Sequence, residues 1–389
     1  MSLLSTPARR WAGTKGVAMA VTSDRPGAEQ TAGSALDLGW LRESSAAWGM
    51  RAEPSRVGLT LRDIARGPYG DVPDHPPRRT MAPRGADIPD DVPDMGYTVN
   101  EKAEVWSDNI MELYEEAVSR QWSATRDIPW GQLAPLDPDL EHAMCQLATV
   151  LSEVEMVAAD FPAKWLWRIN HDFVEAKMFL CTQAMDEARH TEVFRKRALA
   201  NGGGLGKATT VVEQFLKTIL DAESYDEGSA LMHLLGEGVV LSLFRAGEMI
   251  APSEVEKRIF RLCMQDEARH VSYGTMHLRY RLQRDPTLAE DFHAYLDRGE
   301  ELMGVLLTTP EVVEPATILA AGSVDAAVAM GSAASDVLRM QTIEEYLQRC
   351  ERAGLDRRGR MRLPAAVIAG TSGVKTVAPE ASVTVEGAS

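Results

Sequence analysis

From Tyr97 onward, apolar residues recur along the chain at the spacing of amphipathic helices. The stretch VNEKAEVWSDNIMELYEEAVSRQW, for example, places an apolar residue at every third or fourth position, which is the periodicity of an α-helix. Alternating runs rich in valine and threonine, which are typical of strands, are nearly absent. The pattern predicts helices over 99–122, 139–161, 170–200, 208–222, 226–250, 253–284, 286–307 and 335–352.

The two ends of the chain have a different texture. Residues 1–95 are rich in Gly, Pro, Arg and Asp, and proline at that density prevents continuous helix and interrupts sheet ladders. The long helices that follow are joined by short turns, which indicates an all-α bundle. We therefore expect a partly disordered N-terminal arm (1–95), a helical domain (96–308), a C-terminal helical extension (309–362) and a mobile tail of small residues (363–389).

Composition narrows the class of protein. With 389 residues, 45% of them hydrophobic, the chain can bury a large core. A formal net charge of −16 argues against nonspecific binding to nucleic acid or to an anionic membrane. No segment supplies about 18 uninterrupted apolar residues, and the short run VAMAV is not a secretion signal. The four cysteines form no CxxC pair, so we expect reduced thiols in a cytoplasmic protein.

The pentapeptide DEARH occurs twice, 80 residues apart, each time inside a predicted helix. Glu187 and His190, like Glu267 and His270, stand three positions apart, so a carboxylate and an imidazole share one helix face. One such pair offers too few ligands for a metal ion. Four-helix bundles complete a dinuclear site with two Glu-x-x-His pairs and one further Glu from each of two other helices. The repeat therefore predicts a lone inward glutamate upstream of each copy.

Suitable glutamates are present at matching distances. Glu237 stands alone in the apolar run LMHLLGEGVVLSLF, 30 residues before Glu267. The run LATVLSEVEMVAADF offers Glu153 and Glu155, 34 and 32 residues before Glu187. A chain that rises along one helix at about 1.5 Å per residue and descends along the next returns to the same height after such an interval. Two similar helical hairpins are therefore expected to share one centre.

Helical phase decides between the two upstream glutamates. At about 100° per residue, Glu155 lies roughly 70° from the centre of the buried stripe of its helix, and Glu153 lies on the far side. We therefore assign Glu155 as a ligand and expect Glu153 to face solvent. The stripe consists of Leu140, Met144, Leu147, Leu151, Val154, Ala158 and Phe161.

The joint pattern favours a metal site over ordinary packing. A single buried glutamate beside a histidine is more often a hydrogen-bonded pair, but four unpartnered buried carboxylates would be very costly. Carboxylates with two imidazoles and no thiolate suit iron or manganese. We expect two Fe ions, and Mn/Fe remains open. The predicted ligands are Glu155, Glu187, His190, Glu237, Glu267 and His270.

With these residues, the stretch of roughly 97–285 resembles the ferritin-like diiron-carboxylate superfamily. The DE-x-RH form of both motifs is most similar to the oxygenase branch, the hydroxylase subunits of bacterial multicomponent monooxygenases. The resemblance implies a ferritin-like four-helix bundle with additional helices and irregular arms, O2 as co-substrate, and electrons from a separate reductase or ferredoxin. It also implies contacts behind the histidine ligands, made by Asp186, Arg189, Asp266 and Arg269.

Three positions depart from relatives in this superfamily. The ribonucleotide reductase small subunit has a radical-forming tyrosine where this chain has Phe194, four residues after the first motif histidine. Arylamine N-oxygenases carry an additional histidine where Cys263 stands here. The multicomponent hydroxylases have a threonine one turn after the third glutamate, where this chain has Leu241. The resemblance therefore does not extend to those features.

Further residues share the helix faces that point to the predicted centre. His233, one turn before Glu237, is expected to support the ligands by hydrogen bonding more readily than to bind metal itself. For Cys263, the reading as a small buried hydrophobe competes with a place in the substrate cavity. Core packing alone would also explain the apolar members of the set. The predicted cavity residues are Gln183, Cys263, Phe173, Leu180, Phe194 and Leu241.

The leading hypothesis is a dioxygen-dependent oxidoreductase that hydroxylates, epoxidises or N-oxygenates a small organic substrate. A ferroxidase or iron-storage protein is an alternative, against which the long arms argue. A radical-generating or structural metalloprotein is a third, weakened by Phe194. The sequence leaves a homodimer open and predicts neither a nucleic-acid nor a membrane partner.

Overall fold

The computed structural model describes Trp40, residues 48–331 and residues 333–363. By its internal contacts the chain divides between Ala46 and Ala47, and every helix named below belongs to the second part. Most of the first half of the predicted arm and almost all of the predicted tail lie outside the described residues. The described residues contain no strand, and only two isolated bridges, Ser55 with Gly58 and Val99 with Ile169. The all-α prediction is therefore confirmed.

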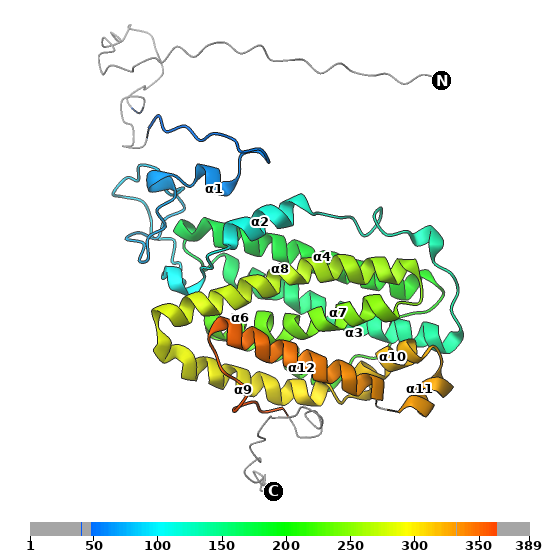
Figure 1. Cartoon of the computed structure of the whole chain (residues 1–389). Coiled ribbons are helices and arrows are strands. Elements are labelled where there is room, and N and C mark those ends of the chain that lie inside the picture. Colours follow the sequence, from blue (N-terminus) through cyan, green and yellow to red (C-terminus); the bar gives the residue numbers. More distant parts are fainter. Residues whose placement is uncertain (1–39, 41–47, 332, 364–389) are drawn as a thin grey trace, which may run out of the picture. The chain divides into compact units, whose positions relative to one another are not determined.

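Four long helices form the bundle at the centre of Figure 1. Two hairpins, α3–α4 and α7–α8, are each built from consecutive helices that pack along each other, and α4 also packs against α8. The helices of the described residues are α1 (Leu61–Ile64), α2 (Ile110–Ser119), α3 (Pro138–Leu166), α4 (Val174–Ala200), α5 (Thr210–Asp221), α6 (Tyr225–Ser229), the π-helical segment η6 (Ala230–Gly236), α7 (Glu237–Ile250), α8 (Glu254–Arg284), α9 (Ala289–Leu306), α10 (Pro310–Ala321), α11 (Val324–Met330) and α12 (Ala333–Ala353).

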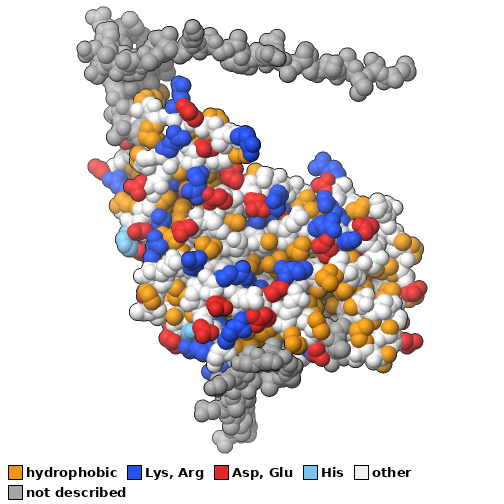
Figure 2. Space-filling view, in the orientation of Figure 1, with side chains coloured by type: hydrophobic (Ala, Val, Ile, Leu, Met, Phe, Trp, Pro, Cys, Tyr) orange, Lys and Arg blue, Asp and Glu red, His pale blue; other side chains and the backbone are white. Residues whose placement is uncertain are grey.

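The remaining helices cover the bundle. Helix α2 packs on α4 and α8, α5 on α3 and α9, α10 on α3, and α12 on α7 and α8. The predicted C-terminal extension thus supplies three helices, of which the sequence pattern located only the last. Figure 2 shows acidic and basic side chains interspersed with apolar ones over the visible face, so the net negative charge is not gathered into one patch there.

Helix α3 is longer than its pattern predicts. It continues through Pro162 to Leu166, one turn beyond the expected end at 161. An interior proline costs about 3 kcal/mol, but Phe161 and Trp165 are both buried and each contributes about 1.5–3 kcal/mol by burial. Packing therefore outweighs the missing backbone hydrogen bond.

The first predicted helix, 99–122, is too long at both ends. Before α2 the chain is extended at Val99, whose carbonyl accepts from the N–H of Asn170 at 2.9 Å. Helix α2 then begins after Asn109 and ends at Ser119. A long-range bridge to the α3–α4 connection replaces the local helix, and the early end leaves Trp122 free to turn into the bundle.

Length and composition alone would allow the stretch Tyr225–Ile250 to cross a membrane, and the bent pair Pro286–Leu306 with Pro310–Ala321 passes a similar test. In the first of these, 78% of the tested window is buried inside the protein. A helix in the core of a protein is buried on most of its faces and is therefore apolar on most of them, so it can pass the same test.

Candidate metal centre

Four helices bring the six predicted ligands together inside the bundle. Helices α3 and α7 each provide one glutamate, and α4 and α8 each provide a Glu-x-x-His pair. All six side chains are at most 3% exposed. They are Glu155, Glu187, His190, Glu237, Glu267 and His270.

The six side chains form two overlapping groups, within each of which the ligand atoms lie within 4.8 Å of one another. Glu187 and Glu267 belong to both groups, whereas each histidine and each upstream glutamate belongs to one. Such an arrangement can hold two metal ions with two shared carboxylates. The groups are Glu155–Glu187–His190–Glu267 and Glu187–Glu237–Glu267–His270.

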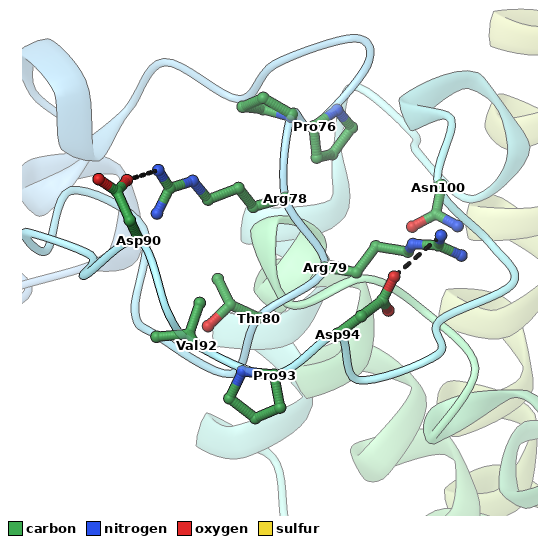
Figure 3. A pocket seen from close by; sticks show the side chains of 10 residues that line it. Pro76, Arg78, Arg79, Thr80, Asp90, Val92, Pro93, Asp94 and Asn100 are labelled. Atoms are coloured by element: carbon green, nitrogen blue, oxygen red, sulfur yellow. Dashed lines mark hydrogen bonds and ion pairs between the residues drawn. The ribbon is translucent and has the colours of Figure 1, made fainter.

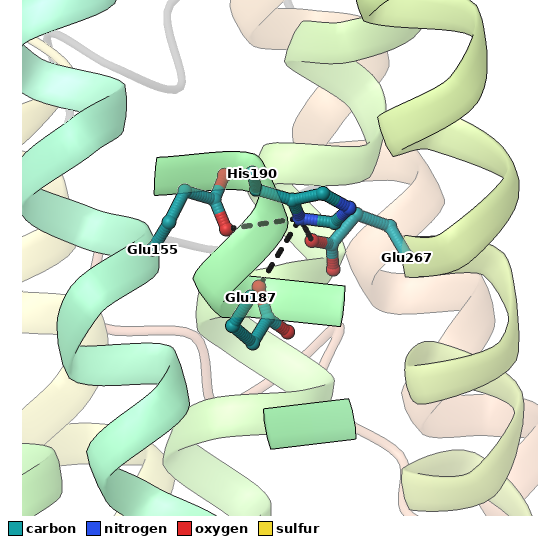
Figure 4. A group of neighbouring side chains, drawn as sticks. All are labelled: Glu155, Glu187, His190 and Glu267. Carbon is teal, nitrogen blue, oxygen red and sulfur yellow. Dashed lines mark hydrogen bonds and ion pairs between the residues drawn. The ribbon is translucent and has the colours of Figure 1, made fainter. Parts of the chain in front are cut away.

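Figure 4 shows the first group converging on one imidazole nitrogen. Nδ1 of His190 lies 3.2 Å from Glu187 Oε2, 3.3 Å from Glu267 Oε1 and 3.4 Å from Glu155 Oε2. These three carboxylates come from α3, α4 and α8, so the site exists only when the helices pack.

The second group has the same form around the other imidazole. Nδ1 of His270 lies 2.9 Å from Glu187 Oε1, 3.5 Å from Glu237 Oε1 and 3.6 Å from Glu267 Oε2. The two oxygens of Glu187 therefore face different histidines, as do those of Glu267. Glu187 and Glu267 would therefore each help to hold both ions.

Unpartnered buried atoms show that the cluster fits a pair of cations. Both oxygens of Glu187 and of Glu267 lack a hydrogen-bond partner, as do Glu155 Oε1, Glu237 Oε2 and His270 Nδ1. A buried polar atom without a partner is costly, and so many acceptors in one place have no donors to satisfy them. Divalent cations would satisfy them.

The electrostatics of the cluster lead to the same conclusion. Burial raises the pKa of Glu155 and of Glu237 well above the usual carboxyl value, and the other carboxylates raise it further. Burial also acts on Glu187, but contacts with both histidines outweigh it and hold its pKa below the usual value. Without cations the cluster would have to take up protons, so metal binding would release them.

The motif aspartates cross between the two hairpins. Asp266 Oδ2 lies 3.1 Å from Nε2 of His190, and Asp186 Oδ2 lies 3.4 Å from Nε2 of His270. A carboxylate only accepts hydrogen bonds, so each Nε2 carries the proton and each Nδ1 presents its lone pair to the glutamates. Each DEARH therefore orients the histidine of the other copy.

The motif arginines complete a buried network of four charges. Arg189 Nη2 donates to Asp266 Oδ2 at 2.9 Å, and Arg269 Nη2 donates to Asp186 Oδ2 at 3.0 Å. Each arginine also pairs with the aspartate of its own motif. Two positive and two negative charges thus balance behind the histidines. The resemblance implied supporting roles for these four residues but not the cross-pairing.

Two residues in contact with this network were not predicted. Trp122 Nε1 donates to Asp266 Oδ2 at 2.7 Å, and its ring stacks on His190 with centroids 6.4 Å apart. Gln121 Oε1 accepts from Arg189 Nη1 at 2.8 Å. Both precede the turn that begins at Ser123, and no spacing in the sequence relates them to the motifs, because they reach the centre only through the path of the chain after α2.

Gln183 and His233 are both fully buried next to the cluster. Gln183 Nε2 donates to Glu237 Oε1 at 2.7 Å, and its Oε1 lies 3.2 Å from His233 Nε2. His233 is thus turned towards an amide and does not join either ligand group. Its role in supporting the ligands stays a prediction.

The other predicted cavity residues lie in packed surroundings. Phe194 has ring contacts with Phe244 at 5.6 Å and with Phe260 at 6.1 Å. Four of these five residues are completely buried and Leu241 is half-buried. None of them lines the pocket that Figure 3 shows, which is formed mainly by residues of the N-terminal arm. The four are Cys263, Phe173, Leu180 and Phe194.

The pocket of Figure 3 lies in the arm and measures about 550 Å³. Its arginines are already paired, Arg78 with Asp90 at 2.7 Å and Arg79 with Asp94 at 3.0 Å. None of the six predicted ligands borders it. It is a hollow between two loops and not part of the metal centre.

Glu153 points away from the cluster, as its phase predicts, but it does not face open solvent. Glu153 as a whole is half-buried, and both of its carboxylate oxygens are buried. Burial and the neighbouring Glu213 of α5 raise its pKa to about 7. The expectation of a solvent-facing side chain was wrong because α5 packs over that side of α3, and helical phase says nothing about a later helix.

No family model matches the chain, and neither does any curated protein. Among solved structures it is similar to R2-like ligand-binding oxidases. One with an aerobically reconstituted metal cofactor after photoconversion is 18% identical, with a TM-score of 0.52, over 65% of this chain and 95% of that one. Another, with an aerobically reconstituted Mn/Fe cofactor after a long soak, is 19% identical, with a TM-score of 0.51, over 65% and 94%.

A variant of the same oxidase with an aerobically reconstituted Mn/Fe cofactor is 20% identical, with a TM-score of 0.52 and coverage of 65% and 95%. Similarity at this level of identity is informative about the fold. The chain therefore shares the helical-bundle fold of the R2-like ligand-binding oxidases.

Proposed function

We propose that the protein is an oxygen-activating oxidoreductase with a dinuclear Fe/Fe or Mn/Fe centre. Its reaction would hydroxylate, epoxidise or N-oxygenate a small organic substrate, with electrons delivered by a separate reductase or ferredoxin. The observation that carries the proposal is the buried set of four carboxylates and two imidazoles, most of whose ligand atoms have no hydrogen-bond partner among the described residues.

The chemistry of the donor set supports iron and manganese. Oxygen donors with two imidazoles, and no cysteine in either ligand group, suit these metals more than zinc or copper(I). Solved structures with the same fold are named oxidases and carry an Mn/Fe cofactor. The bound metals would supply O2 binding and redox equivalents.

The chain's own residues would supply orientation and exclusion of water. Asp266 and Asp186 fix the tautomer of each histidine, which keeps the metal-facing nitrogens unprotonated. On one side, the ring of Phe244 packs beside His190 with centroids 6.2 Å apart, and Phe194 packs on Phe244. Such a dry wall protects reactive species from water.

Metal content and O2 consumption test the proposal together. Anaerobic loading with Fe(II), alone or with Mn(II), should give about two ions per chain. Addition of O2 and a reductant should then produce O2 uptake that a suitable organic substrate stimulates. Glu187→Ala and Glu267→Ala should each lose both ions, because each side chain faces both histidines.

Glu153→Gln is the matched control, since it removes a carboxylate from the same helix as Glu155 but from the opposite face. It should keep two ions. Full metal content in both alanine variants would refute the site. Uptake of many irons per chain into a large assembly, without substrate-stimulated O2 use, would instead show an iron-handling protein.

A further inference from the structure

A chain of three buried polar side chains ends on Glu237. Gln183 Nε2 donates to Glu237 Oε1 at 2.7 Å, the Gln183 carbonyl lies 3.2 Å from His233 Nε2, and His233 Nδ1 lies 2.8 Å from Ser229 Oγ. All four residues are at most 3% exposed. The contacts link α4 to α6, the π-helical segment and α7, and none of them is predicted by the spacing of the motifs.

The direction of each hydrogen bond follows from the carboxylate. Because a carboxylate accepts, the Gln183 amide must present N–H to Glu237 and therefore C=O to His233. His233 must then carry its proton on Nε2, which leaves Nδ1 to accept from the Ser229 hydroxyl. The neutral imidazole agrees with its surroundings, since burial and the nearby His270 hold the pKa of His233 well below its usual value.

Packing holds these hydrogen-bonded side chains in place. The ring of His233 meets Phe161 and Tyr273 edge-on, with centroids 5.3 and 5.2 Å apart. A Cβ at Gly274 would lie 2.1 Å from His233 Cβ, so only glycine there lets α8 approach so closely. His233 is thus confined, and Gln183 has a fixed partner on each side.

Among the described residues, no matching series of hydrogen bonds is seen in the other half of the centre. Gln183 stands four residues before Glu187, and the position four residues before Glu267 is Cys263. His233 stands four residues before Glu237, and four residues before Glu155 the chain has Leu151. The apolar Leu151 cannot donate a hydrogen bond.

Glu155 is accordingly less constrained than Glu237. Its Oε2 lies 3.4 Å from Nδ1 of His190, itself a predicted ligand, and its Oε1 has no partner. Glu237 instead has Oε1 held by a residue outside both ligand groups, while Oε2 stays unpartnered. The oxygen of Glu237 that faces His270 is therefore the one that Gln183 restrains.

We propose that Gln183 is a positioning residue that restrains Glu237 and makes the two metal positions unequal. The position formed by His270 and Glu237 binds its ion more tightly than the position formed by His190 and Glu155. The inference rests on the proposed function, since it requires two ions in the cluster. A ligand already restrained in the metal-free protein loses less conformational freedom on binding. Removal of such a supporting contact typically lowers metal affinity about 10- to 100-fold.

Anaerobic titration of the full-length, metal-free chain with Mn(II) tests this inference. Binding is measured by calorimetry and by the EPR signal of free Mn(II). The wild type should bind two ions in two distinguishable steps. Gln183→Met keeps the length of the side chain but removes both hydrogen bonds, so the tighter step should weaken about 10- to 100-fold and the weaker step should stay unchanged. Thr182→Val is the control, because its hydroxyl bonds only the Phe179 carbonyl of its own helix at 2.7 Å, and both steps should persist.

Gln183→Asn, whose amide is one methylene too short to reach Glu237, should show the same selective loss and replaces the Met variant if that protein does not fold. Two unchanged steps in both variants, or equal weakening of the two steps, would overturn the inference while leaving the proposed function intact. A wild type that binds no pair of ions would instead refute the proposed function. The two failures are therefore distinguishable.

Discussion

Replacing Asp266 with asparagine tests the network behind the histidines. The carboxylate accepts from four donors: Trp122 at 2.7 Å, Arg189 at 2.9 Å and His190 at 3.1 Å on Oδ2, and Arg269 at 2.5 Å on Oδ1. An asparagine of the same shape offers one accepting oxygen and one donating NH2. At least one of the four donors must therefore face another donor.

The magnitude follows from the charge balance. Two arginines and two aspartates cancel in a region where all four side chains are at most 3% exposed. The Asp266→Asn substitution would leave a net buried positive charge, and neutralising one partner of a buried ion pair costs about 3–5 kcal/mol. Whole domains are stable by only about 5–15 kcal/mol, so the loss is a large fraction of the total.

Urea unfolding of the metal-free protein measures this loss without a contribution from bound ions. Asp186→Asn is the matched comparison, since Asp186 occupies the same place in the other motif. Two of its contacts, with Gln121 and His270, are 3.4 Å long, so its loss should be the smaller one. Metal titration should show a separate effect of Asp266→Asn, about 10- to 100-fold weaker binding, because His190 loses its anionic partner.

The unfolding experiment can refute the reasoning. If the free energy of unfolding of Asp266→Asn lies within about 1 kcal/mol of the wild-type value, the four charges do not depend on one another as a buried network requires. If Asp186→Asn is the more damaging variant, the shorter contacts of Asp266 do not decide the balance.

Three further predictions concern pH, packing and metal. His293 accepts at Nδ1 from Arg357 Nη1 at 3.0 Å, and its burial, together with the charges of Arg360 and Arg357, lowers its pKa. The stability that neutral His293 contributes is therefore present above the unfolded-state pKa near 6.5 and is lost as the pH falls below that value. The urea midpoint should accordingly decline less between pH 7 and pH 5 in His293→Gln than in the wild type. Gly274→Ala should destabilise by at least about 1–3 kcal/mol in thermal unfolding, because its new Cβ meets that of His233; an unchanged Tm would contradict the packing. Metal at 100 times its Kd should stabilise the chain by about 2.7 kcal/mol per site, and a chelator should reverse that gain.

The variants of Asp266 and of Gln183 separate two kinds of contribution. Asp266 acts on the stability of the metal-free bundle and on one histidine, whereas Gln183 contacts only one ligand and should leave stability less affected. Agreement of both sets with expectation would assign distinct roles to residues that lie within a single buried cluster.

The sequence by itself determined the features that depend on local geometry. Glu-x-x-His pairs share a helix face whatever surrounds the helix, and the interval from Glu155 or Glu237 to the following motif reflects only helical rise. The phase of Glu155 against its apolar stripe was enough to prefer it over Glu153, and the structure brings Glu155 into the cluster. The all-α bundle follows from the same periodicity.

Only the tertiary structure decided which helix faces meet. That Asp266 holds His190 and not His270, that Trp122 reaches Asp266, and that α5 covers Glu153 all depend on contacts between segments far apart in the chain. Helical periodicity fixes the direction of a side chain about its own axis, but not the neighbour that packs there. The sequence could therefore indicate candidate ligands and some residues behind them, but not which of these residues pair across the bundle.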